Sequence, residues 1–323
     1  MELLTKKRLV LVAGRGHTEL SNEVAEHLNV PLGECVLSTF ANGEIYCRYG
    51  ENIRSADVFV FQTHGGSIND LLMEQLIMID AAKRASAKRI TAVCPFYGYA
   101  RQDRKAEGRE PITARLVADM LTVAGADRVV TVDLHTGQIQ GFFDFPVDHL
   151  TAVPVLVDYL ARELPSGPIT VVAPDAGGGK LARRFADRLN AEIAFIDKRR
   201  PKGTHNVAVA TEVVGEIEGR TCVIVDDIID TASTVVSAAD LLLDRGASEV
   251  LIAATHGLLS GPAVDRLKNS RVREVVVTNT VPVADDKRFD SLSVLSIAPL
   301  LANAIRAVFE DRSVSELFGG DNV

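Results

Sequence analysis

The sequence predicts an α/β protein of two similar domains, each a mainly parallel sheet flanked by helices. Three observations support this fold class. Short runs rich in β-branched residues recur along the chain, helical patterns separate several of them, and 323 residues with 47% apolar content can bury two cores. Alternating strands and helices are typical of parallel sheets that are covered on both faces.

In the first half, strands are expected at residues 8–13, 57–62, 89–94 and 128–132. Residues 69–85 place Leu72, Leu76 and Ile79 at helical spacing and therefore predict a helix. Pro111 is a suitable residue just before a second helix over residues 113–123. A weak strand is expected before residue 40.

The second half repeats this arrangement. Strands are expected at residues 169–173, 193–196, 223–225, 250–254 and 274–277, and helices at 180–189, 235–245, 261–268 and 298–309. The domain boundary is expected near residues 150–158. Because no low-complexity linker marks this boundary, the two halves are expected to pack closely.

Composition narrows the possible functions. A net charge of -8 argues against a general nucleic-acid or anionic-membrane surface, since such surfaces require basic patches. The four cysteines lack CxxC spacing and indicate neither disulfides nor a zinc site. The N-terminus does not have the pattern of a secretory signal, and no apolar stretch has membrane-spanning length. A cytoplasmic enzyme is expected.

Residues 222–234, CVIVDDIIDTAST, carry the pattern around which the rest of the chain can be interpreted. A strand over 223–225 would place Asp226 and Asp227 at its carboxyl end, where open α/β sheets bind ligands. Residues 230–234 then lead into a helix whose N–H groups and hydroxyls can hold a phosphate, while two carboxylates suit sugar hydroxyls or magnesium. The segment predicts a site for a phosphorylated sugar, although an ordinary strand edge and helix cap would also fit.

A second connection, VVAPDAGGGK at residues 171–180, has a run of three glycines. Glycine lets the backbone approach a diphosphate closely, and a helix N-terminus adds partial positive charge. This is not a Walker A loop, because Pro174 and Leu181 occupy positions where that pattern requires glycine and serine or threonine. A glycine-rich helix start without a ligand is the alternative.

Two basic segments stand out in this acidic chain. Residues 97–115 contain five cationic side chains, which can neutralise a polyphosphate. Arg101 can make bidentate contacts to the phosphates, and the neighbouring Gln102 can contact them with its side chain. Residues 194–200 end in Lys198, Arg199 and Arg200, and cations on a closing loop can stabilise a phosphoryl-transfer transition state. Taken alone, either segment could be a solvated basic loop.

Two further segments place polar residues after expected strands. FANGE, residues 40–44, contains the turn dipeptide Asn-Gly and could be no more than a turn. DLHTG, residues 133–137, puts His135 beside Asp133 at a strand end, a suitable place for a metal ligand or an anion contact. A lone histidine is, however, more often structural.

Residues 226–234 resemble the phosphoribosyl-diphosphate-binding motif shared by phosphoribosyltransferases and ribose-phosphate diphosphokinases. FANGE, YARQDRK, DLHTG and the other segments described above are similar to the diphosphokinases specifically, and the resemblance covers nearly the whole chain. It implies phosphoribosyltransferase-like folding of both domains. Residues 1–153 would form the N-terminal α/β domain with the ATP-binding segments, and residues 154–323 the C-terminal α/β domain with the ribose 5-phosphate site.

The resemblance also implies roles for individual residues. Those implied for ATP binding are Phe40, Asn42, Gly43, Glu44, Arg101 and Gln102, with Phe40 stacking on adenine, partly across a subunit interface. Those implied for ribose 5-phosphate are Asp226, Asp227, Asp230, Thr231, Ala232, Ser233 and Thr234. The implied magnesium ligands are His135 and Asp175, and the implied catalytic residues are Lys198 and Arg200.

The chain departs from the family pattern at two positions. Ser233 stands where the family often has glycine, and a Cβ there could crowd the phosphate and lower its affinity. Asn42 stands where many relatives have aspartate, which keeps a hydrogen-bonding group.

The implied reaction is transfer of the diphosphoryl group of ATP to the anomeric hydroxyl of ribose 5-phosphate, giving 5-phosphoribosyl 1-diphosphate and AMP. The resemblance further implies dimers assembling into a hexamer, with phosphate and ADP as effectors. Arg48, Arg104 and residues 313–318 lie in segments that resemble the regulatory region. Neither a nucleic acid nor a membrane is expected as a partner.

Two alternatives remain open at this point. A phosphoribosyltransferase would share residues 226–234 but would use a base as acceptor. A catalytically silent regulatory homologue would have a damaged active site, whereas His135, Asp175, Lys198 and Arg200 are all present.

Overall fold

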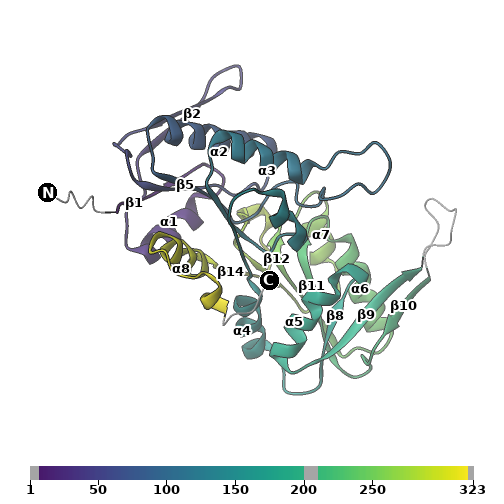
Figure 1. Cartoon of the computed structure of the whole chain (residues 1–323). Helices are drawn as coiled ribbons and strands as arrows, with labels where there is room; N and C mark the ends of the chain where they lie inside the picture. The colour runs from purple at the N-terminus through teal and green to yellow at the C-terminus, as the bar shows by residue number, and fades with distance from the viewer. Residues whose placement is uncertain (1–6, 200–209, 319–323) are drawn as a thin grey trace. The chain divides into compact units, whose positions relative to one another are not determined.

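The protein is described by a computed structural model, which covers residues 7–199 and 210–318 (Figure 1). The chain forms two compact units. Unit 1 comprises residues 1–151, 280–282 and 296–323, and unit 2 comprises residues 152–279 and 283–295. The expected boundary after residue 153 lies next to the change of unit at Thr151, but the last segment clusters with the N-terminal half. We therefore propose a domain division in which residues 296–323 belong with unit 1.

Unit 1 is built on a five-stranded sheet in which all neighbouring strands are parallel. In spatial order its strands are β1 (Leu9–Ala13), β4 (Asp57–Phe61), β5 (Arg89–Cys94), β6 (Arg128–Val132) and β7 (Val147–Leu150). The central strands are buried along almost their whole length, as expected for a parallel sheet covered on both faces.

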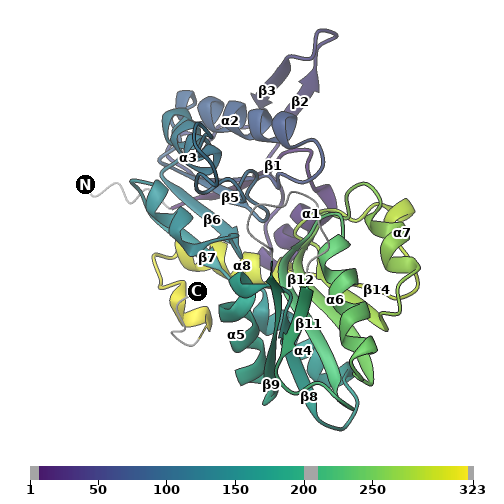
Figure 2. The same cartoon turned by 90° about the vertical axis from the view of Figure 1, so that its right-hand side faces the viewer.

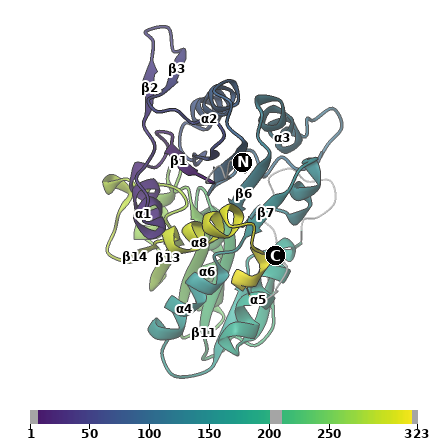
Figure 3. The ribbon, with the colours of Figure 1, turned by 60° about the vertical axis from the view of Figure 1, so that its left-hand side comes forward.

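Helices α2 (Ile68–Arg84) and α3 (Thr113–Ala124) pack on one face of this sheet and share its hydrophobic core. Helix α1 (Thr18–Leu28) packs against α8 (Ala298–Phe309), so segments almost a chain length apart lie side by side (Figure 3). Two short 3-10 helices, η1 (Gly137–Phe142) and η4 (Ser315–Phe318), complete the described part of the unit.

A bridge of charged residues fixes the C-terminal segment to the unit 1 sheet. Arg89 donates two hydrogen bonds, of 3.1 and 2.6 Å, to the buried carboxylate of Asp57. Its third nitrogen donates to Asp311, just beyond α8, at 2.8 Å. Because the buried Asp57 would be costly without a cation, this pairing gives a physical reason for the return of the chain to unit 1.

An antiparallel hairpin, β2 (Cys35–Thr39) and β3 (Ile45–Tyr49), extends from unit 1 beside α2 (Figure 2). Its residues alternate between half-buried and exposed along both strands. The half-buried side, which includes Leu37 and Tyr49, packs against the core beneath α2, and the other side faces solvent.

Unit 2 is built on a seven-stranded sheet. In spatial order its strands are β10 (Ala210–Val214), β9 (Glu192–Arg199), β8 (Ile169–Ala173), β11 (Thr221–Ile229), β12 (Glu249–Gly257), β13 (Glu274–Thr278) and β14 (Leu292–Leu295). Strands β9 and β10 pair antiparallel, and every other neighbouring pair is parallel.

Helices flank this sheet as well. Helices α6 (Ser233–Asp244) and α7 (Ala263–Lys268) share one core with β11, β12 and β13. Helices α4 (Val153–Glu163) and α5 (Gly179–Leu189) pack together, and the 3-10 helix η2 (Ala176–Gly178) precedes α5. A second 3-10 helix of this unit is η3 (Asp285–Lys287). The predicted fold class is confirmed: each unit is a mainly parallel sheet with flanking helices.

Within the described part of the chain, no helix combines the length and apolar character needed to cross a bilayer.

Candidate active site

Strand β11 continues beyond the point that the sequence predicted. Asp226 and Asp227 were expected at the end of a strand over 223–225, but β11 runs to Ile229 and Asp226 pairs with Ala254 of β12. On the other side, pairing with β8 stops at Ile224, opposite Val172. The two carboxylates therefore lie beyond the end of β8, although they still belong to a strand, because β12 alone extends alongside them.

Asp175 reaches the same edge of the unit 2 sheet from β8. Its Oδ1 accepts hydrogen bonds from the N–H groups of Gly177 at 2.8 Å and Gly178 at 3.1 Å, so it caps η2. Two N–H groups of the glycine run thus bind a carboxylate of their own chain in this structure. Asp175 also lies close enough to Asp226 for its negative charge to raise the pKa of that carboxyl.

The surroundings of the acid pair raise the pKa of Asp226 and so favour its neutral form. Burial, above all, and then the hydrogen bond and charge of Asp227 raise the pKa of Asp226 to about 8. The Asp227 N–H donates to Asp226 Oδ1 at 2.9 Å and partly offsets this rise. A cluster of carboxylates that resists full ionisation is suited to sugar hydroxyls or to a divalent cation, either of which would replace the missing solvation.

The loop after β11 leads into a helix whose N-cap side chain makes no capping hydrogen bond. Ala232 is the N-cap of α6 and has φ 59°, and its methyl side chain cannot accept a hydrogen bond from the first turn of the helix. A helix N-terminus of this kind is suited to binding an anion. The strained residue of the loop is Ala232, whereas Ser233 already has its place in the helix.

Two contacts hold the loop in shape. Arg266 of α7 donates from Nη1 to the carbonyl oxygen of Thr231 at 2.8 Å. The N–H of Ser260 donates to the carbonyl oxygen of Asp230, also at 2.8 Å. Sequence reasoning missed both residues, because they come from the segment after β12 and nothing near them in the sequence signals contact with residues 230–234.

The predicted catalytic residues are only partly described. The backbone of Lys198 lies in β9, where it pairs with Thr211 of β10, one residue pair before the last pair of that hairpin, Arg199 with Ala210. Arg200 lies outside the described residues. Their roles stay predictions.

In unit 1 the FANGE segment forms the tip of the β2–β3 hairpin. The N–H of Phe40 donates to the carbonyl oxygen of Glu44 at 2.8 Å, and Asn42 Oδ1 accepts from the Glu44 N–H at 3.2 Å. Gly43 has φ 93°, which glycine adopts without strain. Phe40 is 54% exposed and meets Tyr46 edge to face, with ring centroids 6.1 Å apart. An exposed aromatic ring at a hairpin tip is suited to stacking on a base.

A cavity of about 400 Å³, lined by both apolar and charged side chains, lies below this tip, between the hairpin and α2. The buried carboxylate of Glu74 is held there by Arg15 Nε at 2.6 Å and Gln62 Nε2 at 2.8 Å. Gly43 also lines the cavity. Sequence reasoning overlooked Arg15 and Glu74, because a lone arginine and a carboxylate inside a helix carry no motif.

The other two predicted segments of unit 1 are joined directly. Thr136 of DLHTG donates from Oγ1 to Asp103 Oδ2 of YARQDRK at 2.8 Å. The side-chain oxygen of Gln102, Oε1, accepts a hydrogen bond from Thr113 Oγ1 at 2.6 Å. The main-chain carbonyl oxygen of Gln102 accepts from the N–H of Ala114. The side chains of His135 and Arg101 are exposed in the same region. The structure therefore gathers the predicted polyphosphate and metal segments at the carboxyl ends of β5 and β6.

Among the residues that the structure describes, no three His, Cys, Asp or Glu side chains form a group able to hold a metal ion by themselves. Fewer protein ligands are enough for magnesium, because this ion keeps several waters and binds through one or two carboxylates and substrate phosphates.

Comparisons with known proteins support one family. A family model described as the N-terminal domain of ribose phosphate pyrophosphokinase matches residues 9–125, and the phosphoribosyl synthetase-associated domain matches residues 201–319. The chain is 56% identical to a ribose-phosphate pyrophosphokinase of Streptomyces avermitilis over 313 residues, which cover 97% of each chain. It is 58% identical to a protein of the same name from Bifidobacterium longum, over 97% of this chain and 93% of the other.

A solved structure agrees with the sequence comparisons. The crystal structure of phosphoribosylpyrophosphate synthetase from Mycobacterium smegmatis superposes with a TM-score of 0.90 at 54% identity, covering 94% of this chain and 100% of the other. Similarity of this extent, over both units, goes well beyond a shared fold class. The chain belongs to the ribose-phosphate pyrophosphokinase family.

Proposed function

We propose that the protein transfers the diphosphoryl group of ATP to the anomeric hydroxyl of ribose 5-phosphate, forming 5-phosphoribosyl 1-diphosphate and AMP. The observation that carries this proposal is similarity over almost the whole chain to proteins named ribose-phosphate pyrophosphokinase. A phosphoribosyltransferase would explain the unit 2 loop but not the match of residues 9–125 to the N-terminal domain of a pyrophosphokinase.

The sugar phosphate is assigned to the connection from β11 to α6. The 5-phosphate would accept hydrogen bonds from the first N–H groups of α6 and from the hydroxyls of Thr231, Ser233 and Thr234. Asp226 and Asp227 would accept from the ribose hydroxyls. Their proximity to Asp175 supports this role, because binding of polar groups would offset the cost of crowding three carboxylates.

The nucleotide is assigned to unit 1. Phe40 would stack on the adenine, while Asn42, Gly43 and Glu44 at the same hairpin tip would bond its edge. Arg101 and Gln102 would contact the phosphate chain, which suits their exposed position beside the bonded Asp103 and Thr136.

Magnesium is the proposed metal, with His135 as a ligand in unit 1 and Asp175 as a ligand in unit 2. When bound, the ion would withdraw charge from the phosphate oxygens of ATP. Lys198 and Arg200 would place positive charge at the β-phosphorus as the bond to the AMP oxygen breaks and the anomeric oxygen attacks in line. The proton of the anomeric hydroxyl must leave during this attack.

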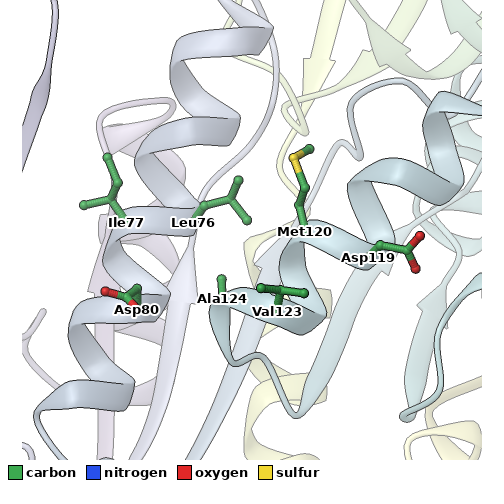
Figure 4. Close-up of a pocket in the computed structure, with 7 residues that line it drawn as sticks. All are labelled: Leu76, Ile77, Asp80, Asp119, Met120, Val123 and Ala124. Carbon is green, nitrogen blue, oxygen red and sulfur yellow. The ribbon is translucent and has the colours of Figure 1, made fainter.

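We further propose that the protein forms homo-oligomers, with dimers assembling into a hexamer. An apolar groove of about 480 Å³ between α2 and α3 supports self-association (Figure 4). Leu76, Met120 and Val123 line it, and Val123 is 80% exposed. Monomeric soluble proteins rarely expose apolar side chains that lie together in a patch of this kind. Phosphate and ADP are the proposed effectors, and Arg48, Arg104 and residues 313–318 are the segments assigned to them.

The reaction is tested with ATP labelled at the β-phosphorus, supplied with ribose 5-phosphate and magnesium but without any base. We expect equal amounts of unlabelled AMP and labelled phosphoribosyl diphosphate. Formation of ADP and a sugar carrying only the γ-phosphoryl group would contradict the proposal, and a need for a base would favour a phosphoribosyltransferase. No release of AMP from the folded protein with magnesium would favour a silent regulatory homologue.

A further inference from the structure

Two cysteines meet between the strands of the β2–β3 hairpin. Cys35 Sγ and Cys47 Sγ are 3.5 Å apart and share a hydrogen bond. Cys35 pairs with Tyr49 and Cys47 with Leu37, so the two thiols are diagonal neighbours rather than directly opposite. Both are half-buried on the hairpin side that packs toward α2, whereas Cys94 and Cys222 are buried inside central strands.

We propose that Cys35 and Cys47 are a site of reversible disulfide formation, which oxidants of the low-molecular-weight disulfide class can modify. Three features of the pair support this. The two sulfur atoms need to approach by only about 1.5 Å to reach bonding distance. Both side chains are accessible in part, and a hairpin strand can move more easily than a buried central strand.

The two thiols share a hydrogen bond in which either sulfur can be the donor, so either thiol can ionise first. Burial and the nearby Glu74 carboxylate oppose ionisation of both and raise the pKa of Cys35 above its usual value. The cysteine that ionises attacks the small disulfide, displaces one thiolate and forms a mixed disulfide. The other cysteine then loses its proton and displaces the second thiolate, so the protein is oxidised by two electrons and the small disulfide is reduced to two thiols.

Because the two cysteines are diagonal neighbours, a disulfide between them would be strained and would twist the hairpin. Diagonal neighbours in an antiparallel pair have Cα atoms about 7–8 Å apart, beyond the roughly 4.4–6.8 Å of ordinary disulfides. Bond formation must therefore twist the hairpin, and a strained disulfide is readily reduced again. Cys35 and Cys47 flank the tip that carries Phe40 to Glu44, so the twist would displace this tip. The consequence for ATP rests on the proposed function of the tip.

The modification is tested on the full chain with oxidised glutathione, followed by mass spectrometry of the intact protein and of its peptides. We expect the wild type to lose two hydrogen atoms and to give one peptide linking Cys35 to Cys47, with Cys94 and Cys222 still free. Dithiothreitol should restore the starting mass. Cys35→Ser and Cys47→Ser should instead each accumulate glutathione on the remaining cysteine of the pair, because the resolving thiol is missing.

A wild type that keeps four free thiols, or that stops at the same stable glutathione adduct as Cys35→Ser, would overturn the proposed site. The coupling to the hairpin tip is tested separately by kinetics. Oxidation should raise the KM for ATP by about threefold or more with the KM for ribose 5-phosphate unchanged, and should have no such effect on Cys35→Ser. An unchanged KM for ATP in the linked protein would overturn the coupling. Failure of the proposed function would instead appear as absence of AMP release from the reduced protein.

Discussion

At the scale of single residues, the unit 2 site brings the carboxyl groups of Asp175, Asp226 and Asp227 close together. Asp226 has a raised pKa because it is buried beside Asp227 and near Asp175. The sequence predicted the three carboxylates and their place near strand ends, since apolar runs precede both segments. It did not predict that β11 continues past the acids, because aspartate is unfavourable in strands and only the long partner β12 makes the extension possible.

Lys198→Ala is expected to reduce kcat by about a hundredfold or more, because a cation at the β-phosphorus acts mainly in the transition state. The thermal midpoint should change little. Steady-state kinetics and a melting curve measure both quantities. Lys268→Ala, which removes an exposed lysine at the end of α7, is the matched control and should leave kcat unchanged. Near-normal turnover of Lys198→Ala would contradict the assigned role.

His64 should make stability depend on pH. It is fully buried, accepts from the Gly98 N–H through Nδ1, and bonds Gln75 through Nε2. Burial lowers its pKa from 6.5 to about 4. Between pH 6.5 and about 4, His64 is protonated in the unfolded chain but not in the folded protein. The free energy of unfolding therefore falls as the pH drops through this window, and the contribution of His64 is fully present above it.

The expected loss is about 2 kcal/mol between roughly pH 7.5 and pH 5. Urea unfolding at both pH values measures it. His64→Gln does not titrate in this window, so its stability should fall less than that of the wild type. An equal fall in both proteins would show that other groups dominate.

At the scale of elements, the connection from β11 to α6 depends on a neighbour that is distant in sequence. Arg266 of α7 bonds the carbonyl oxygen of Thr231 and so holds the strained turn at Ala232. Strands β5, β6, β8 and β13 and helix α8 were predicted closely, because their apolar patterns are clear and long enough. Helix α4 was overlooked because its apolar residues lie where a domain boundary was expected.

Arg266→Gln should raise the KM for ribose 5-phosphate by about tenfold, because it removes the charged donor that bonds Thr231 in the proposed phosphate-binding loop. The KM for ATP should remain the same. Arg271→Gln offers a control in the same unit, since Arg271 bonds the exposed Asp244 and does not contact the loop. Equal changes in both Michaelis constants would indicate general damage to unit 2 instead of a local effect on the loop.

At the scale of the whole molecule, we propose that the two mainly parallel sheets have separate roles, the nucleotide binding at unit 1 and the sugar phosphate at unit 2. Strand and helix alternation was enough to predict this architecture. The return of residues 296–323 to unit 1 was not predictable, since the packing of α8 on α1 and the Asp311 to Arg89 ion pair are long-range contacts without a local pattern. The clustering of Asp103 with Thr136 follows from the strand order, which places β5 beside β6.

Self-association through the α2–α3 groove predicts that Val123→Glu weakens assembly by about tenfold or more, because a buried charge without a partner is costly. Analytical ultracentrifugation across a concentration series measures this. Val214→Glu is the matched control: Val214 is also an exposed valine, at 58%, but lies on β10 of unit 2. If Val123→Glu assembles like the wild type, the oligomer interface lies elsewhere.

The central claim is that the connection from β11 to α6 is the site for the sugar phosphate. The most direct measurement is a crystal structure of the protein with ribose 5-phosphate. We predict the phosphate group at the N-terminus of α6, against residues 230–234, with the ribose hydroxyls facing Asp226 and Asp227. Ribose 5-phosphate bound at another place, with this connection empty, would contradict the account.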